Sequence, residues 1–327
     1  MATTDQNLGL DIVRVTEAAA LASSRWFGRG NKKAGDQAAV NAMRLSFNLV
    51  PIIGTIIIGE GAKDEAPMLF NGEAVGNGTG PTMEVAVDPL EGTNLLAFGQ
   101  PNAISVVGLA PAGAMYNPGP SYYMQKLVVP DLARNAVDLD APVADNIRRV
   151  AKALGKNIED LIIFVLDKPR HKYLVEAIQA AGARSQLHTD GDVNGSLMTV
   201  DPLCKVDMML GTGGTPEGVL SACAIRGMGG CMLARLDPQS EAEKQAIIEA
   251  GMDLQEILTE ATLIKSENVF FAATGISDGI FLQGVVYNDF GATTHSLVIR
   301  GKTGTMRSIF SRHSWNKLIR NSEAKHH

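Results

Sequence analysis

The chain has few of the features that mark several large protein classes. Its 327 residues include three cysteines, Cys204, Cys223 and Cys231, and no C-x-x-C pair, so neither a disulfide framework nor a thiolate zinc site is expected. No apolar run approaches the roughly 18 residues of a membrane helix, and residues 1–10 lack the basic and apolar regions of a signal peptide. These absences predict a cytoplasmic protein, not a membrane protein, whose cysteines are core thiols.

Positive charge is also scarce. Lys and Arg number 29 against 35 Asp and Glu, and the resulting net charge of −6 argues against nucleic acid or an anionic membrane as a partner. Hydrophobic residues make up 45% of the chain, which excludes a disordered polymer. At about 150 residues per domain, the length predicts two parts, which we place at 1–133 and 134–327 as halves of one functional unit. The final His326-His327 is interpreted as a remnant of an expression tag.

What the chain does contain is an acidic turn after a buried strand. Residues 83–87 alternate as a strand does, and Pro89 lacks the N–H that would continue the ladder, so we expect the strand to end at Asp88. Asp88 and Glu91 flank the turn, and Gly92-Thr93 follows with free backbone N–H groups. Carboxylates attract hard cations and free N–H groups attract anions, so the turn can hold a metal and a phosphate side by side.

Other acidic and basic groups stand at the ends of predicted elements. Helices are expected at 8–26 and at 36–49, with Asp36 as the N-cap of the second, and a strand at 54–59 leads to Glu60. Glu60 opens an acidic loop that contains Asp64 and Glu65. Further strands are expected at 103–109, 122–129 and in a C-terminal meander over 268–299 that includes 280–286.

From residue 142 to residue 228 helical and strand patterns alternate, which predicts a mainly parallel sheet covered by helices on both faces. In such sheets, ligands bind beyond the carboxyl ends of the strands. This rule points to three loops, at 167–171, 189–192 and 211–217. The last of these is rich in glycine but lacks the Gly-Lys-Ser/Thr of a P-loop.

The order of these motifs resembles a known family. Residues 88–93 match the Asp-Pro-Ile/Leu-Asp/Glu-Gly-Thr signature of the lithium-sensitive phosphatase superfamily, with Glu91 in place of the commoner Asp. The chain from about residue 8 to about residue 310 resembles the class II fructose-1,6-bisphosphatases in its ordered motifs, which are Gly28-Arg29-Gly30 with Asp36, Ile58–Gly61, Glu65–Leu69, Asp88–Thr93, Tyr123-Met124, Lys168–His171, Asp190–Asp192 and Pro216–Gly218. One departure is Asn31, where many members carry Asp.

The resemblance implies an α/β (α+β) fold, the five-layered αβαβα sandwich of the sugar phosphatase and inositol monophosphatase type. It implies a phosphoric monoester hydrolase that converts fructose 1,6-bisphosphate to fructose 6-phosphate and phosphate in gluconeogenesis. It also implies inhibition by lithium and assembly as a homo-oligomer, a dimer or tetramer. Asn94-Leu95 resembles the branch that takes sedoheptulose 1,7-bisphosphate, so a sedoheptulose-1,7-bisphosphatase, a dual-specificity sugar bisphosphatase and an inositol-phosphate phosphatase stay open as alternatives.

The family's site residues carry over to matching positions of this sequence. Two or more Mg²⁺ or Mn²⁺ ions would be held by Asp36, Glu60, Asp88, Glu91 and Glu217. The catalytic group would consist of Thr93, Glu60 and Asp88. The sugar bisphosphate would be bound by Glu91, Gly92, Thr93, Tyr123, Lys168, Pro169, Arg170, Asp190, Gly191, Asp192 and Gly214. Independently of any resemblance, oxygen-only ligands suit hard cations, and Arg170 is suited to grip a phosphate with two N–H groups.

Each of these residues also has an ordinary explanation when taken alone. A single acid at a strand end is most often a cap or a solvated turn, Lys168 and Arg170 would be an exposed pair, and Tyr123 a strand aromatic. The spacing of Asp190, Asp192, Asn194 and Asp201 nearly matches an EF-hand loop, which offers a non-enzymatic calcium-binding module as a rival function. That loop requires an entering helix, yet residues 184–188 are expected to form a strand.

Overall fold

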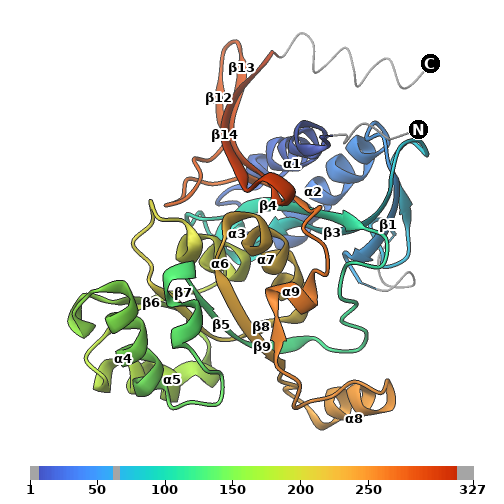
Figure 1. Ribbon diagram of the computed structural model, residues 1–327. Coiled ribbons are helices and arrows are strands. Elements are labelled where there is room, and N and C mark those ends of the chain that lie inside the picture. The colour runs from blue at the N-terminus through green and yellow to red at the C-terminus, as the bar shows by residue number, and fades with distance from the viewer. Residues whose placement is uncertain (1–6, 62–66, 315–327) are drawn as a thin grey trace.

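Two β-sheets with helices against their faces organise the chain (Figure 1). The structure is a computed structural model that describes residues 7–61 and 67–314. The acidic loop residues Asp64 and Glu65 and the terminal His326-His327 lie outside the described residues. Within the described part, no helix is both long and apolar enough to cross a bilayer.

The first sheet has eight strands in the order β12-β13-β11-β4-β3-β1-β2, with β14 paired to the other edge of β13. Its strands are β1 (Ile53–Ile58), β2 (Ala74–Val75), β3 (Thr82–Glu91), β4 (Ile104–Pro111), β11 (Phe270–Gly275), β12 (Val286–Asn288), β13 (Gly291–Arg300) and β14 (Thr305–Ser314). The second sheet has six strands in the order β10-β9-β5-β8-β6-β7. They are β5 (Tyr123–Val129), β6 (Ile162–Leu166), β7 (Arg184–His188), β8 (Met208–Gly214), β9 (Cys231–Leu236) and β10 (Leu258–Thr259).

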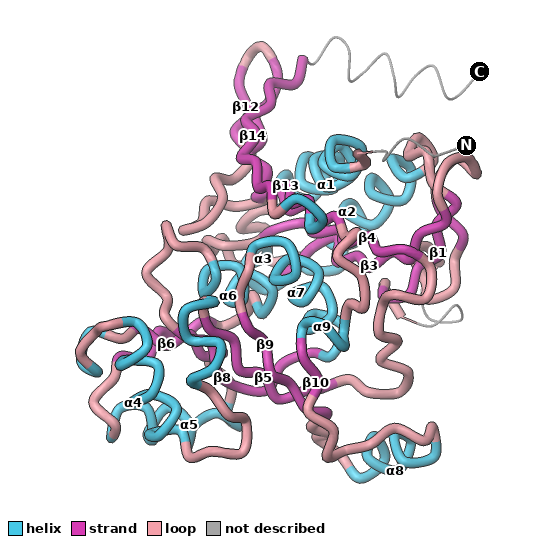
Figure 2. Tube along the Cα trace, viewed as in Figure 1, coloured by secondary structure: helices cyan, strands magenta, loops and turns pink. Residues whose placement is uncertain are grey.

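The helices form three layers around these sheets (Figures 1 and 2). Helices α1 (Gly9–Ser23) and α2 (Lys32–Phe47) share a core with the outer face of the first sheet. Helices α6 (Asp192–Val200), α7 (Thr215–Met228) and α9 (Glu260–Leu263) lie between the sheets. Helices α4 (Val143–Leu154) and α5 (Lys172–Ala180) cover the outer face of the second sheet. The elements outside these layers include α3 (Thr93–Ala97) and α8 (Glu241–Glu249).

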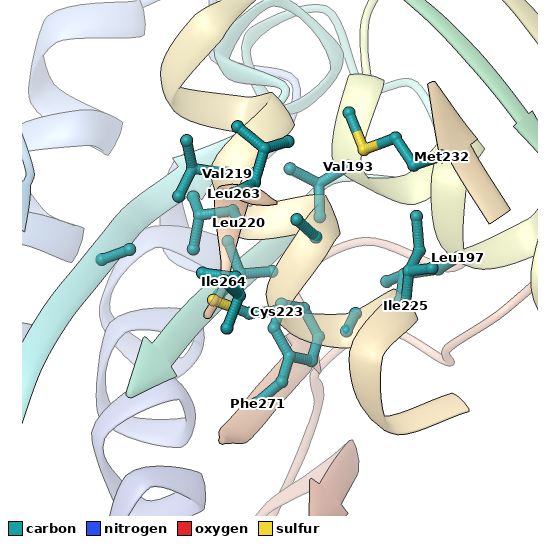
Figure 3. Packing of buried hydrophobic residues seen from close by; sticks show 14 of the residues in the cluster. Val193, Leu197, Val219, Leu220, Cys223, Ile225, Met232, Leu263, Ile264 and Phe271 are labelled. Atoms are coloured by element: carbon teal, nitrogen blue, oxygen red, sulfur yellow. The ribbon is translucent and has the colours of Figure 1, made fainter. Parts of the chain in front are cut away.

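The central core explains why the two sheets stay together. Val193 and Leu197 of α6 and Val219 and Leu220 of α7 are fully or almost fully buried, and they pack in one cluster with Phe271 of the first sheet (Figure 3). Both helices present apolar side chains to the space between the sheets, and all residues of α6 and most residues of α7 are buried. The order helix, sheet, helix, sheet, helix confirms the predicted layered α/β sandwich.

Sheet membership does not follow the order of the sequence. Strand β5 belongs to the second sheet although it precedes residue 133, and β11 to β14 return to the first sheet. The division into 1–133 and 134–327 stays a prediction, but each half supplies strands to both sheets. The strands of residues 142–228, β6, β7 and β8, pair in parallel as predicted, but the second sheet as a whole is mixed, because β5, β9 and β10 join it in antiparallel pairs. Strand β5 enters the middle of that sheet antiparallel to β8 and β9.

Two local predictions also need correction. Helix α2 begins four residues before Asp36, and its N-cap is Asn31, whose side chain accepts the Ala34 N–H at 3.1 Å. The Asn at the position where many relatives carry Asp therefore serves as a helix cap. No strand forms over 280–285; the only part of the predicted segment in a strand is Val286, at the start of β12. Of the predicted core thiols, Cys223 and Cys231 are buried, whereas Cys204 is half-buried.

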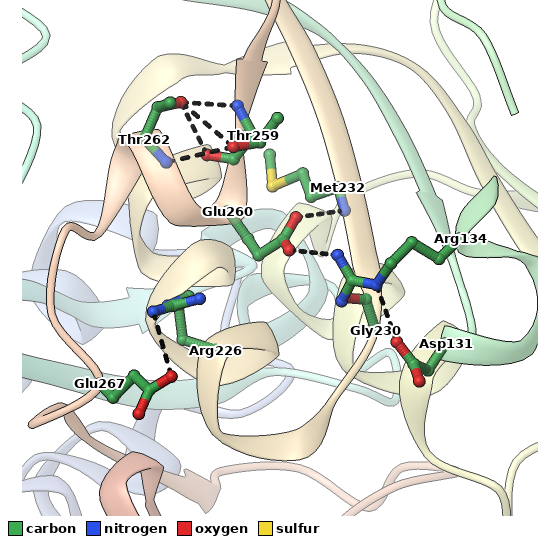
Figure 4. Close-up of polar contacts among 9 residues, drawn as sticks. All are labelled: Asp131, Arg134, Arg226, Gly230, Met232, Thr259, Glu260, Thr262 and Glu267. Atoms are coloured by element: carbon green, nitrogen blue, oxygen red, sulfur yellow. Dashed lines mark hydrogen bonds and ion pairs between the residues drawn. The ribbon is translucent and has the colours of Figure 1, made fainter.

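A polar network joins α9 to the second sheet (Figure 4). Glu260 is 5% exposed, and its two carboxylate oxygens accept the Met232 N–H at 3.0 Å and Nη1 of Arg134 at 2.6 Å. Arg134 also contacts Asp131 at 2.8 Å. The carboxylate thus satisfies a buried backbone donor as well as a half-exposed cation, so its loss leaves both without that partner.

We expect Glu260→Ala to lower the free energy of unfolding by roughly 1–3 kcal/mol, the cost of leaving a buried N–H unpaired beside a partly screened cation. Urea unfolding measures the change. The matched control is Glu267→Ala, because Glu267 is 77% exposed and lies 4.0 Å from Arg226 (Figure 4). That variant should stay within about 0.5 kcal/mol of the unmodified chain. Equal losses for both variants would contradict the importance assigned to burial.

Candidate metal and phosphate site

A β-bulge brings Asp88 and Glu91 to the same side of β3. Asp88 pairs with Val106 and Glu91 with Ile104, so Pro89 and Leu90 face a single residue of β4. Residues three apart in a regular strand point to opposite faces, and the extra residue of a bulge cancels that alternation. The prediction that the strand ends at Asp88 was wrong, because the proline sits in the bulge, where its missing N–H is tolerated.

The turn that follows the bulge has the backbone shape expected from its glycine. Gly92 has φ of +90°, and Thr93 is the first residue of α3. Asp88 stabilises the bulge itself, because its Oδ1 accepts the Leu90 N–H at 3.0 Å. Thr93 therefore begins a short helix two residues after Glu91.

A third acid approaches from another part of the chain. One carboxylate oxygen each of Asp88, Glu91 and Glu217 lies within 4.8 Å of the others. Glu217 is in the first turn of α7, after β8, so the central helix layer brings it to the first sheet. Burial raises the pKa of all three groups, that of Glu91 to about 8, and each is raised further by neighbouring acids. Burial and mutual repulsion therefore disfavour full ionisation of the cluster at neutral pH.

Asp36 and Glu60 extend this cluster. Burial and then the charge of Asp36 raise the pKa of Glu60 to about 7, and Glu60 in turn raises the pKa of Asp88. Of the five acids that the sequence predicted as metal ligands, Asp88, Glu91 and Glu217 thus form the compact cluster, and Asp36 of α2 and Glu60 after β1 act on it through their charge.

The chemistry of these groups fits hard divalent cations. The donors are all carboxylate oxygens, and Glu217 Oε2 is buried without a hydrogen-bond partner among the described residues. Glu91 keeps one oxygen engaged, because its Oε1 accepts the Val193 N–H of α6 at 3.0 Å. Mg²⁺ and Mn²⁺ prefer such ligands, and a cation here would relieve the mutual repulsion.

Next to the acids is an open pocket of 470 Å³. It is lined by Glu91, Tyr122, Tyr123, Leu166, Lys168, Arg170, Asp190, Asp192, Gly213, Gly214, Pro216 and Glu217. Most of the residues predicted to bind substrate therefore share one cavity with two of the predicted metal ligands. Gly92, Thr93, Pro169 and Gly191 do not line it; Pro169 begins a short 3₁₀ helix, and Gly191 caps α6 with φ of +100°.

Arg170 is held in place by the backbone of β8. Its Nε and Nη2 donate to the Thr212 carbonyl at 3.0 and 2.8 Å, and its guanidinium lies over the Tyr123 ring at 5.1 Å. Beneath it, buried His171 donates from Nδ1 to the Leu166 carbonyl at 2.7 Å and accepts the Thr212 N–H at Nε2, 2.8 Å away. Burial lowers the pKa of His171, so the imidazole is neutral and links β6 to the residue that anchors Arg170.

Two glycines allow the backbone of β8 to pass between the carboxylates. A Cβ on Gly213 would lie 1.9 Å from Asp192 Oδ2, and one on Gly214 would lie 1.7 Å from Glu217 Oε2. Any side chain at these positions would displace an acid. The sequence predicted Gly214 as a substrate contact, but the need for a close approach becomes visible only in the structure.

The calcium-binding loop proposed as a rival function was wrong. Its first residues, Asp190 and Gly191, follow strand β7 instead of an entering helix, and residues 192–200 form helix α6. Asn94 Nδ2 donates to Asp190 at 3.1 Å, which ties the loop to α3. The spacing of oxygen side chains was right for an EF-hand, but the packing of Val193 and Leu197 in the central core imposes a helix.

Sequence reasoning missed Lys126, which lies in the middle of β5. It is fully buried, and its ammonium contacts Asp192 and the Gly214 carbonyl. A single Lys in a strand carries no sequence signal for such a role, and its position beside an acid emerges only when α6 packs on β5.

Comparisons with known proteins point to one family. Residues 6–313 match the family model described as "Bacterial fructose-1,6-bisphosphatase, glpX-encoded". Over 321 residues, the chain is 44% identical to "Fructose-1,6-bisphosphatase 1 class 2" of Escherichia coli (strain K12), in a match that covers 94% of this chain and 95% of that protein. Proteins named "Fructose-1,6-bisphosphatase class 2" from Escherichia coli O6:H1 and Shigella flexneri match with the same identity and coverage.

Proposed function

The chain belongs to the bacterial, glpX-encoded family of fructose-1,6-bisphosphatases, and from this premise we propose how its acids and pocket hydrolyse a sugar bisphosphate. The activity is that of a phosphoric monoester hydrolase that releases phosphate from fructose 1,6-bisphosphate, as in gluconeogenesis. We assign the 1-phosphate to the acidic cluster and the 6-phosphate to Lys168 and Arg170. The observation that supports this orientation most is that Glu91 and Glu217, which cluster with Asp88, line one pocket together with Lys168 and Arg170.

We assign metal binding to the acidic residues and orientation of the reacting groups to Thr93. Asp36, Glu60, Asp88, Glu91 and Glu217 would hold two or more Mg²⁺ or Mn²⁺ ions, which when bound lower the pKa of water and neutralise charge on phosphate oxygens. Thr93 would orient the attacking water or the phosphate through its hydroxyl and its N–H, with Gly92 permitting the turn. Glu60 and Asp88 would take up the proton that water loses. Burial raises the pKa of Glu60 to about 7, which is close to the value that suits a general base at neutral pH.

Substrate contacts are proposed for the residues around the pocket. Arg170 would grip the 6-phosphate with donors not used by Thr212, and Lys168 would add a second charge. Tyr123 lies under the Arg170 guanidinium and would limit its motion. Asp190 and Asp192 would face the sugar hydroxyls, and Pro169, Gly191 and Gly214 would shape the backbone around them.

A phosphate-release assay tests the function. Purified protein is incubated with fructose 1,6-bisphosphate, sedoheptulose 1,7-bisphosphate, fructose 6-phosphate and inositol monophosphate, each with Mn²⁺, with Mg²⁺ or with EDTA. We expect phosphate from fructose 1,6-bisphosphate with either metal and none with EDTA. Release from inositol monophosphate alone would contradict the proposed substrate, and release in EDTA would contradict the metal site.

Some finer properties stay predictions. A substantial rate with sedoheptulose 1,7-bisphosphate in the same assay would make the enzyme dual-specific. Millimolar LiCl should inhibit the reaction, and undiminished activity would count against lithium sensitivity. We also propose a cytoplasmic homo-oligomer, a dimer or tetramer, which light scattering of the purified chain would test.

His171 should affect substrate binding through Arg170. We expect His171→Leu to raise KM for fructose 1,6-bisphosphate about three- to tenfold with kcat within about twofold, because the Thr212 peptide loses its partner and uniform binding is weakened. Arg170→Ala should raise KM by more, about 10- to 100-fold, from the loss of a charged donor pair. The control is His295→Leu, since His295 also accepts a backbone N–H, from Gln283 at 3.0 Å, but lies in β13 away from the pocket. A fall in kcat without a change in KM would contradict the proposed link.

A further inference from the structure

Lys126 is a cation buried inside the protein beside the acidic cluster. It is 0% exposed, it extends from the central strand β5 of the second sheet, and its Nζ donates to the Asp192 carboxylate and to the Gly214 carbonyl, the latter at 2.6 Å. A buried ammonium is costly unless it is paired, and truncation of one partner leaves the other charge uncompensated. The pair is therefore a specific arrangement and not a solvated surface contact.

The negative charge of Asp192 acts on the acidic cluster. It is 5% exposed, and its presence raises the pKa of both Glu91 and Glu217. Lys126 acts in the opposite direction on Glu217, where it lowers the pKa and offsets the influence of Asp192. The ammonium is hydrogen-bonded to Asp192 and to the carbonyl of Gly214, the residue that lies directly against Glu217, so both acids are near it.

The backbone reinforces this arrangement. Gly214 accepts a hydrogen bond from Lys126 at its carbonyl, and the same residue lies directly against Glu217. Its neighbour Gly213 lies directly against Asp192. Gly218 of α7 also leaves room for the lysine, since a Cβ there would lie 3.3 Å from Lys126 Cε. Four elements, β5, α6, β8 and α7, therefore meet around the Lys126 side chain.

We propose that Lys126 is a positioning residue that acts as a built-in cation of the acidic cluster, holding Asp192 and the Gly214 carbonyl so that Glu217 stays available to a divalent metal ion. Asp192 serves mainly as the partner that keeps the ammonium away from Glu217. The inference deepens the proposed function and rests on its metal site.

The two partners can be removed separately or together. In Asp192→Asn the Lys126 ammonium loses its carboxylate partner. We expect the ammonium to pair with Glu217 instead, where it competes with the metal ion for that carboxylate. In the double variant Lys126→Met with Asp192→Asn, that competitor is gone and the neutral pair keeps nearly the same volume. In Lys126→Met alone, a carboxylate without its cation faces the cluster, which favours a bound metal.

The test is the affinity of the full chain for Mn²⁺ alone, without substrate. It is measured by electron paramagnetic resonance or by calorimetry. We expect Asp192→Asn to weaken Mn²⁺ binding about tenfold or more, as a unit charge a few Å away predicts. The double variant should return to within about threefold of the unmodified protein, which is the rescue that defines the role. Lys126→Met should bind Mn²⁺ at least as tightly as the unmodified chain.

A purely structural role gives a different pattern. The control, Asp207→Asn, breaks the pair between Asp207 and Lys156, 2.5 Å apart at the opposite end of β8, and should lower thermal stability without changing Mn²⁺ affinity. Equal weakening in Asp192→Asn and the double variant would overturn the inference, because Asp192 would then act as a ligand itself. Unchanged binding in Asp192→Asn would also overturn it, and this comparison remains decisive if the Lys126→Met chain does not fold.

Failure of the inference is distinct from failure of the function. If the unmodified chain binds no Mn²⁺ and releases no phosphate, the proposed metal site is wrong and the role of Lys126 falls with it. If the unmodified chain binds Mn²⁺ but the variants do not follow the predicted order, only the role of Lys126 is wrong.

Discussion

Asp88→Asn is expected to lower kcat by roughly 10²–10³-fold or more, while the fold is kept. Asp88 has three acids around it, since the charges of Glu91, Glu60 and Glu217 all raise its pKa. Asparagine has the same shape and can still accept the Leu90 N–H, so the bulge persists. What disappears is the charge that the cations and the attacking water require, and this loss acts on the transition state.

The same substitution should not reduce stability in the absence of metal. One repulsive charge leaves a buried acidic cluster, so the midpoint of urea unfolding in EDTA should stay equal or rise. Added Mn²⁺ should stabilise the unmodified chain and stabilise the variant less. Activity and unfolding would thus move in opposite directions, which simple misfolding cannot produce.

The control for this experiment is Asp140→Asn. Asp140 is 62% exposed and forms an ion pair of 2.7 Å with Arg235. We expect unchanged kcat and KM, since an exposed ion pair is worth little and Asp140 belongs neither to the acidic cluster nor to the pocket. A near-normal rate for Asp88→Asn in saturating Mn²⁺ would remove Asp88 from the metal site.

Gly214→Ala should have the second-largest effect, a loss of about 10²-fold in activity. The added Cβ would lie 1.7 Å from Glu217 Oε2, whereas the φ of −66° at Gly214 is one that alanine readily adopts. The backbone therefore resists little, and Glu217 must move away from Asp88 and Glu91. Displacement of a site group by about 1 Å is enough for a loss of this size.

Measurements of both stability and activity distinguish the displacement of Glu217 from the general cost of replacing a glycine. Gly155→Ala is the control, because Gly155 has φ of +64° and a Cβ added there would have no atom of the described residues within 4 Å. It should lower the free energy of unfolding by about 1 kcal/mol through backbone strain, with kcat unchanged. Gly214→Ala should show weaker Mn²⁺ binding as well as lower kcat. Full activity in that variant would mean that Glu217 is not needed where the structure places it.

Local chemistry made several parts of the molecule predictable. Helix α4 ends at Gly155, which has the positive φ of a C-cap, and strand β1 ends just before Glu60 as its glycine boundaries indicate. The acidic turn can be predicted because its proline, its glycine and its two carboxylates all lie within six consecutive residues, 88–93. The resemblance to a family then joined acids that no periodicity could relate, and the oxygens of three of them, Asp88, Glu91 and Glu217, lie within 4.8 Å of one another.

Long-range packing explains the errors. The order of strands in the second sheet cannot be read from alternating helices and strands, because β5 enters it from before residue 133 and runs antiparallel to β8. The oxygen spacing after Asp190 fits a calcium loop until the apolar side of α6 is placed between two sheets. Pro89 ends a regular ladder but not a bulged one, and the register with β4 decides which is present.

By itself, the sequence determined which residue types are available, the turn that carries Asp88, Glu91 and Thr93, and the family to which these motifs point. Only the tertiary structure decided that Lys126 meets Asp192, that Gly213 and Gly214 pass against two carboxylates, and that Glu217 reaches Asp88. The physical reason is that propensity and spacing act over a few residues, whereas the contacts of Lys126 and Glu217 join residues about 60 to 130 positions apart and exist only once the sheets have packed around α6 and α7.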